Sequence, residues 1–223
     1  MADAAHQLHT PLTALRTNLE LATSEADLSR QLGFLEAAQA QTGRLGSLVN
    51  NLLDLSRLEA ASDQHQPAPV DLAELAHQVS ELYAARAEQA GLSFRLEVPA
   101  EAVPVNADRQ ELRMVLENLL DNAIKFTPAG GELSLAVQTI PEYACLVVED
   151  SGIGIPAEDQ PRLFQRFHRA SNAAAYPGSG LGLAIVKAIA DRHQGTIRLE
   201  SQPGRTCFTL VLPAPGLPRI TSN

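Results

Sequence analysis

The chain has 223 residues, of which 45% are hydrophobic and 19% charged, a composition that is typical of soluble globular proteins and excludes fibrous and disordered ones. Its formal net charge is -9 and it has no segment rich in lysine and arginine, so we expect no nucleic-acid partner. It has no apolar run of about 20 residues, the length needed to cross a membrane, so we expect a soluble chain. A helical pattern is already under way at Met1, which suggests a further region upstream.

Residues 1–61 are expected to form a helical hairpin. The stretch TSEADLSRQ separates two helical runs, with Ser24 or Asp27 as the N-cap of the second. A lone hairpin buries only one face of each helix, so we predict a homodimer in which two hairpins form a four-helix bundle. The apolar residues recur at steps of three and four, as on one helical stripe: Leu12, Leu15, Leu19, Leu45, Leu48, Leu52, Leu55 and Leu58.

The polar stretch SDQHQPAP, residues 62–69, is expected to be a linker to a second domain over residues 70–214, and residues 215–223 a C-terminal tail. The second domain is expected to be an α/β sandwich, one sheet with helices on one face, which makes the whole chain α+β. The two cysteines, Cys145 and Cys207, lie in predicted strands and are expected to be buried thiols. The predicted helices are 71–90, 108–126 with Asp108 as N-cap, and 181–193; the predicted strands are 92–98, 131–139, 143–149, 196–201 and 206–212.

Three stretches of the second domain carry chemistry suited to a nucleotide. NLLDNAIKF places Asn118 and Asn122 one helical turn apart, where their amide oxygens can bind a hard cation. In VEDSGIGIP, the carboxylate of Asp150 can accept hydrogen bonds from an amino group such as that of adenine. GSGLGLAIVKAIA is a glycine-rich turn at a helix start, where free N–H groups can bind phosphate. Each stretch alone also has a plain structural explanation: the first could be a solvated helix face, the second a tight turn and the third a hinge.

Taken in order, these stretches resemble the sensor histidine kinases. NLLDNAIKF, DSGIGIP, FQRFHR and GSGLGLAIVKAIADRHQG look like the N, G1, F and G2 boxes of that family, and GRTCFTLVLP is similar to its closing strand motif. HQLHTPL resembles the H box, usually His-Glu-Leu-Arg-Thr-Pro-Leu. The resemblance covers nearly the whole chain and implies a dimerisation and phosphotransfer hairpin followed by an ATP-binding domain with the Bergerat fold.

The resemblance also implies roles for matching residues. His6 matches the phosphorylated histidine, and Thr10 the position that assists hydrolysis of the regulator's phosphoaspartate, which implies an additional phosphatase activity. Asn122, assisted by Asn118, matches the Mg²⁺ ligand, and Asp150 the carboxylate that reads adenine. Residues 156–179 match the lid over ATP. The other matches are nucleotide-binding positions: Lys125, Gly152, Gly154, Arg169, Gly178, Gly180, Leu181, Gly182 and Thr206.

The reaction implied is in-line attack of a ring nitrogen of His6 on the γ-phosphorus of ATP, with Mg²⁺ as cofactor. Phosphate then passes to an aspartate on the receiver domain of a response regulator. The family also implies that the chain is the cytoplasmic part of an inner-membrane sensor, whose membrane region lies outside the given sequence.

The H box departs from its commonest form at two positions. Gln7 replaces glutamate, so its amide can orient the ring of His6 but cannot take its proton. Kinases similar to tricarboxylate-responsive sensors also carry glutamine there. His9 stands where arginine is common.

Several alternatives remain open at this stage. His6 and His9 could bind a metal, although further ligands would be needed. Thr10 and Pro11 could begin the first helix, whereas the family runs the helix through His6. Two other protein classes compete: the related Bergerat-fold ATPases, which do not phosphorylate themselves, and scaffolds whose ATP site has decayed.

Overall fold

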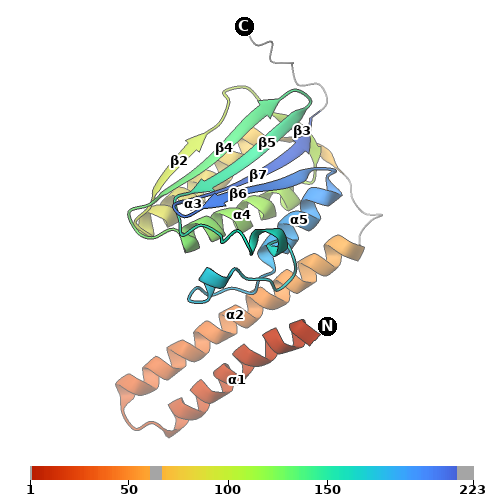
Figure 1. The fold of residues 1–223 in the computed structure, drawn as a ribbon. Coiled ribbons are helices and arrows are strands. Elements are labelled where there is room, and N and C mark those ends of the chain that lie inside the picture. The colour runs from red at the N-terminus through yellow and green to blue at the C-terminus, as the bar shows by residue number, and fades with distance from the viewer. Residues whose placement is uncertain (1, 61–66, 215–223) are drawn as a thin grey trace.

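A computed structural model describes residues 2–60 and 67–214, with side chains from Leu8 onward. Its first two helices, α1 (Ala2–Ser24) and α2 (Leu28–Ala60), form an antiparallel hairpin (Figure 1). Helix α1 runs through His6 and contains Pro11, so it does not begin at Thr10. The N-cap of α2 is Asp27, whose carboxylate accepts a hydrogen bond of 3.1 Å from the backbone N–H of Arg30.

The second domain is an α/β sandwich, which confirms the predicted fold class. Its five-stranded sheet has the order β2-β4-β5-β7-β6; β2 and β4 are parallel and the other neighbours antiparallel. Helices α3, α4 and α5 cover one face of this sheet (Figure 1). The strands are β2 (Ser93–Glu97), β4 (Glu132–Ile140), β5 (Tyr143–Asp150), β6 (Thr196–Gln202) and β7 (Arg205–Pro213), and the helices α3 (Leu72–Gln89), α4 (Arg109–Phe126) and α5 (Gly182–Arg192).

A second, two-stranded sheet was not predicted from the sequence. Strand β1 (Ala68–Asp71) pairs with β3 (Pro104–Ala107), and β1 begins inside the segment 62–69 that was expected to be a linker. Both strands have four residues and contain a proline, so neither carries a strand pattern. Two short 3-10 helices, Gln160–Arg162 and Ser171–Ala173, lie in the predicted lid.

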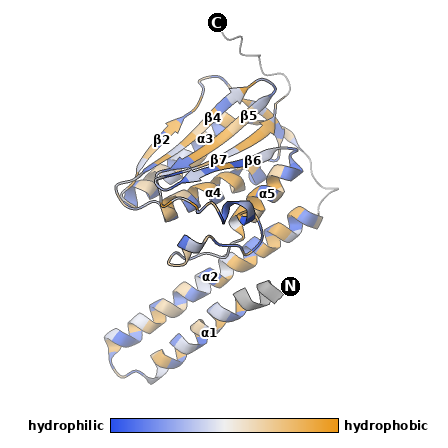
Figure 2. Cartoon of the chain, in the orientation of Figure 1, coloured by the Kyte–Doolittle hydropathy of each residue, from blue (hydrophilic) through white to orange (hydrophobic). Residues whose placement is uncertain are grey.

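One hydrophobic core joins the helices of the second domain to its sheet. Leu119 of α4, Leu146 of β5 and Ile185 of α5 are among its fully buried side chains, each worth roughly 1.5–3 kcal/mol relative to exposure. Hydrophobic stretches run along β4, β5 and β7 (Figure 2). Leu55 of α2 belongs to the same core, so the hairpin is packed against this domain.

The cysteines follow the expectation for free thiols. Cys145 and Cys207 are both buried and unbridged, and burial raises the pKa of each thiol. Among the helices of residues 2–60 and 67–214, none combines the length and apolarity that crossing a bilayer requires.

Candidate nucleotide site

A cavity of about 1010 Å³ lies where α4, the end of β5, the lid segment and the start of α5 meet. The hairpin closes one side of it through Thr10, and Leu48 of α2 is also in its wall. Gly152 and Leu181 are not in the wall, and the side chains of His6 and Gln7 lie outside those described. The other predicted residues all line it: Asn118, Asn122, Lys125, Asp150, Gly154, Arg169, Gly178, Gly180, Gly182 and Thr206.

Asp150 ends β5 and is only 7% exposed. Burial raises the pKa of its carboxyl to about 6, although hydrogen bonds from the backbone N–H of Gly152 at 2.9 Å and from the hydroxyl of Thr127 at 3.5 Å act in the opposite direction. A buried carboxylate at the cavity wall is a strong acceptor for a ligand's amino group. Thr127, which follows NLLDNAIKF, was not predicted.

Gly152 and Thr206 are neighbours of Asp150 in the turn and in the sheet. A Cβ at Gly152 would lie 2.6 Å from Oδ1 of Asp150, so the turn needs glycine here for close approach. Thr206 stands opposite Asp150 in the β5–β7 register, and its hydroxyl is 3.0 Å from that of Ser201. Of these two, only Thr206 lines the cavity.

Two amide side chains of α4 offer oxygen to a cation. The amide nitrogen of Asn118 donates to the carbonyl of Met114 at 2.8 Å, which turns its oxygen toward the start of α5. Asn122 lies one turn further along α4 and also lines the cavity. Neutral oxygen donors suit Mg²⁺, which keeps several waters and takes its other ligands from substrate phosphates. The donor set therefore fits Mg²⁺ held jointly with a nucleotide.

Lys125 places a cation beside these amides. Its Nζ lies 4.2 Å from the centroid of the Phe126 ring. Burial, and next the nearby guanidinium of Arg169, lowers its pKa to about 8. The ammonium still dominates at neutral pH, and an anionic ligand would favour it further.

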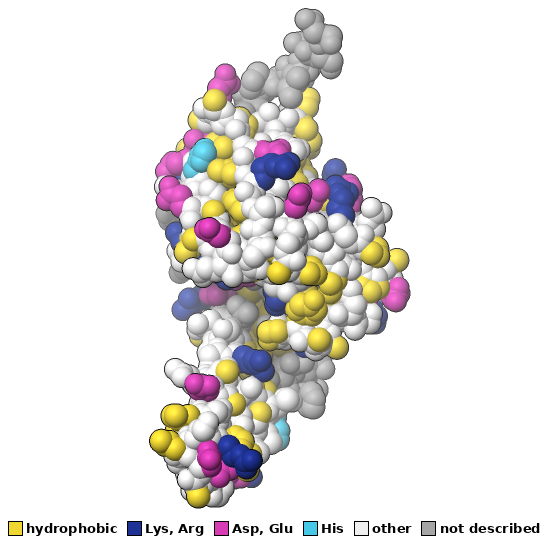
Figure 3. Space-filling view, turned by 90° about the vertical axis from the view of Figure 1, so that its left-hand side faces the viewer, with side chains coloured by type: hydrophobic (Ala, Val, Ile, Leu, Met, Phe, Trp, Pro, Cys, Tyr) yellow, Lys and Arg dark blue, Asp and Glu magenta, His cyan; other side chains and the backbone are white. Residues whose placement is uncertain are grey.

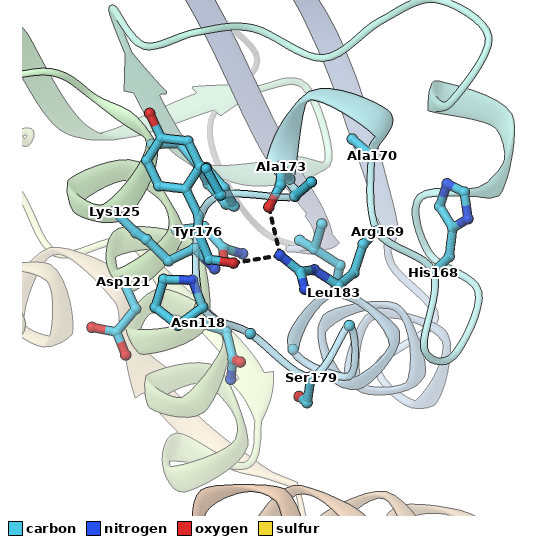
Figure 4. Close-up of a pocket in the computed structure, with 18 of the residues that line it drawn as sticks. Asn118, Asp121, Lys125, His168, Arg169, Ala170, Ala173, Tyr176, Ser179 and Leu183 are labelled. Atoms are coloured by element: carbon cyan, nitrogen blue, oxygen red, sulfur yellow. Dashed lines mark hydrogen bonds between the residues drawn. The ribbon is translucent and has the colours of Figure 1, made fainter. Parts of the chain in front are cut away.

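The lid segment is held against the cavity by contacts that were not predicted. Arg169 donates through its guanidinium to the carbonyls of Ala173 and Tyr176 (Figure 4). The ring of Tyr176 packs on that of Phe126, with centroids 5.0 Å apart. Arg169 must release these carbonyls to contact a phosphate. Phe126 closes the NLLDNAIKF stretch and Tyr176 is the one aromatic residue of SNAAAYPGSG, which are the only sequence signals for this pair.

The glycine-rich turn brings the start of α5 close to α4. Gly180 has a φ of +72°, and a Cβ there would lie 2.7 Å from the carbonyl oxygen of His168. A Cβ at Gly182, the first residue of α5, would lie 2.5 Å from Oδ1 of Asn118. Leu181 between them is fully buried. The positive end of the α5 dipole thus faces the amide side chains of α4, as a phosphate site requires.

Comparison with known proteins agrees with this arrangement. The family model described as "His Kinase A (phospho-acceptor) domain" matches residues 1–61, and that described as "Histidine kinase-, DNA gyrase B-, and HSP90-like ATPase" matches residues 107–216. The signal transduction histidine-protein kinase/phosphatase MprB of Mycobacterium ulcerans (strain Agy99) is 37% identical over 231 residues. The match spans 98% of this chain and 44% of that protein.

The chain belongs to the sensor histidine kinases. It spans less than half the length of the curated histidine kinase that it matches. The solved structure of the mycobacterial sensor histidine kinase MprB is 36% identical to it, with a TM-score of 0.60, over 66% of this chain and 97% of that one.

Two other histidine kinase structures resemble most of the chain. Full-length ShkA in complex with AMPPNP is 30% identical, with a TM-score of 0.70, over 94% of this chain and 45% of that one. ThkA in complex with the response regulator protein TrrA is 25% identical, with a TM-score of 0.78, over 96% and 60%. The hairpin and the α/β sandwich of this chain are thus both those of a histidine kinase.

Proposed function

We propose that this chain binds Mg²⁺ and ATP in the cavity, phosphorylates itself on His6 and passes the phosphoryl group to an aspartate of a response regulator. Residues 1–61 would be the dimerisation and phosphotransfer domain, and residues 70–214 the ATP-binding domain. One observation carries the proposal: Thr10, one helical turn after His6, lines the same cavity as Asn122, Asp150 and the glycine turn.

In the proposed complex, the carboxylate of Asp150 accepts a hydrogen bond from the adenine amino group, while Lys125 and the start of α5 bind the phosphates. Asn122, with Asn118, holds Mg²⁺, which neutralises charge on the phosphate oxygens when bound. The complex of ShkA with AMPPNP, an ATP analogue, supports a nucleotide in this kind of site.

The phosphoryl transfer itself needs little activation of His6. A neutral imidazole has a free lone pair near neutral pH, so the protein mainly has to align that nitrogen with the γ-phosphorus. Gln7 can hold the ring through its amide, and Arg169 is placed to exchange the lid carbonyls for phosphate oxygens. The lid segment has to move for this exchange.

The hairpin supports the proposed homodimer. Leu12, Leu19, Leu28, Leu32 and Leu35 are all exposed in a single chain, and hydrophobic side chains are visible on the surface of the hairpin in the lower part of Figure 3. A second hairpin would cover them as a four-helix bundle.

The relatives support the proposed partner and a second activity. ThkA is found in complex with the response regulator TrrA, which supports a receiver domain as the acceptor of phosphate. MprB is named a kinase/phosphatase, and Thr10 in the cavity wall supports a phosphatase activity here. We place the chain on the cytoplasmic side of an inner-membrane sensor, anchored by a region outside this sequence.

The decisive experiment is incubation of the full chain with Mg²⁺ and γ-labelled ATP. We expect label on the protein that is lost in acid and stable in base, and that is absent from His6→Ala. His9→Ala, which removes the neighbouring histidine, is the matched control and should keep the label. Label that persists in His6→Ala would show that the acceptor is wrong, and ATP hydrolysis without labelled protein would favour a Bergerat-fold ATPase.

A further inference from the structure

The position of the ATP-binding domain relative to α2 decides which histidine it can reach. In a bundle of two antiparallel hairpins, each α2 has its own α1 on one side and the α1 of the second copy on the other. Because the ATP-binding domain follows α2 in the chain, its cavity can open toward only one of these sides at a time.

In this structure the cavity opens toward the α1 of the same chain. Thr10, Pro11 and Ala14 of α1 form part of its wall, together with Ser47 and other residues of α2. Thr10 comes four residues after His6, which corresponds to about 6 Å along the helix axis. The acceptor position is therefore one turn beyond a residue that already lines the cavity.

An apolar contact holds the domain on this side of α2. Leu55 is buried in the core of the ATP-binding domain, and Leu52 and Leu58 pack against that core. Only residues 61–66 connect Ala60 to Pro67, so the domain stays within about 25 Å of the end of its own α2.

Polar contacts fix the same junction. The guanidinium of Arg192 at the end of α5 donates to the carbonyl of Leu58 at 3.1 Å, and its Nε lies 3.3 Å from Oε1 of Glu111 on α4. Both side chains of this pair are largely buried, at 13% and 15% exposure. Arg166 of the lid segment forms an ion pair with Glu59 of α2. Two parts of the ATP-binding domain, helix α5 and the lid segment, thus make polar contacts with α2 of the same chain.

We infer that autophosphorylation runs within one chain, so that the nucleotide site of a chain phosphorylates the His6 of its own α1. This inference rests on the proposed function and specifies how it operates in the dimer. A small movement of the domain along α2 brings the γ-phosphate to the adjacent turn of the same α1. Reaching the second copy's α1 would require the domain to leave Leu55 and cross to the other side of α2.

Mixed dimers of the full chain test this inference. Two purification tags of different size select dimers that contain one chain of each kind. The first dimer pairs His6→Ala with Asn122→Ala, and the second pairs the unaltered chain with the double variant His6→Ala, Asn122→Ala. Asp150→Asn replaces Asn122→Ala in a repeat, in case one variant does not fold, and circular dichroism checks the helicity of each.

After incubation with Mg²⁺ and γ-labelled ATP, we expect label at the background level in the first dimer and clear label on the unaltered chain of the second. The opposite pattern, label on the Asn122→Ala chain of the first dimer and background in the second, would overturn the inference and show transfer between chains. The unaltered homodimer serves as reference: if it takes up no label, the proposed function itself fails, and this inference fails with it.

Discussion

The hairpin and the ATP-binding domain use leucine in opposite ways. In the domain, Leu112, Leu116, Leu119 and Leu120 of α4 are completely buried in a core formed within one chain. In the hairpin, Leu28, Leu32 and Leu35 also follow one another at steps of four and three, yet Leu28 is 69% exposed. Only Ala22, Ala38, Leu48 and Leu55 are buried hydrophobic residues of α1 and α2 among those described. The leucines of the domain therefore form a core within one chain, whereas those of the hairpin are left for the proposed contact with a second hairpin.

The largest effect should come from a matched pair of leucine substitutions. Leu119→Ala leaves a cavity in a closed core and should lower the free energy of unfolding by about 2–5 kcal/mol. Leu32→Ala, at a side chain 52% exposed in one chain, should cost no more than about 0.5 kcal/mol in dilute solution. Its cost should grow with protein concentration, because a second hairpin covers the site in the proposed homodimer. Urea denaturation at several concentrations measures both, and equal costs at all concentrations would contradict the comparison.

Asp150→Asn should separate stability from nucleotide binding. Burial raises the pKa of Asp150 from 3.8 to about 6, so the folded state binds more protons than the unfolded state between these values. The stability contribution of this group falls as pH rises through that window and stays low above it. Removing the buried charge should stabilise the protein at pH 7.5 by about 1–2 kcal/mol, within the limit set by the pKa shift.

The same substitution should weaken ATP binding about 10- to 100-fold at pH 7.5, because a charged acceptor for the adenine amino group is lost. The affinity of the unaltered protein should approach that of the variant as pH falls through about 6. Calorimetry measures the affinity of both proteins at each pH. The protonation of ATP affects both proteins equally, so it cancels in the ratio of their affinities. Loss of stability together with loss of binding would argue that Asp150 is structural.

An effect smaller than that of Leu119→Ala is expected at the junction of the hairpin and the domain. Arg192→Ala removes the bond to the Leu58 carbonyl and the partner of Glu111, which should cost about 1–3 kcal/mol. We expect the unfolding of the hairpin helices and of the domain to separate into two transitions by calorimetry. The control is Arg198→Ala on the exposed edge strand β6, which should change little. One unaltered transition in Arg192→Ala would show that the remaining contacts couple the regions without Arg192.

The sequence predicted what depends on local periodicity. The helices at Leu72–Gln89 and Arg109–Phe126 and the long strands lie within one or two residues of their expected bounds, because regular alternation and caps such as Asp108 set them. Strands β1 and β3 were missed because four residues carry no period. Most of the residues named from family motifs line one cavity.

Contacts between distant parts of the chain could not be predicted. Arg192 and Leu58 are 134 residues apart in the sequence, and neither local sequence predicts the hydrogen bond between them. Arg169 was expected to contact phosphate, yet its bonds to lid carbonyls depend on how the lid folds back. The ring contact of Phe126 with Tyr176 likewise arises only when α4 and the lid come together.

The hydrogen bond between Arg192 and the Leu58 carbonyl has a consequence for the end of helix α2. Leu58 lies in the last turn of α2, where carbonyl groups have no partner within the helix. The ATP-binding domain therefore supplies the C-terminal cap of the helix to which it is attached. A rotation or stretch at the end of α2 would move this carbonyl relative to Arg192 and so change one of the contacts that join α2 to α5.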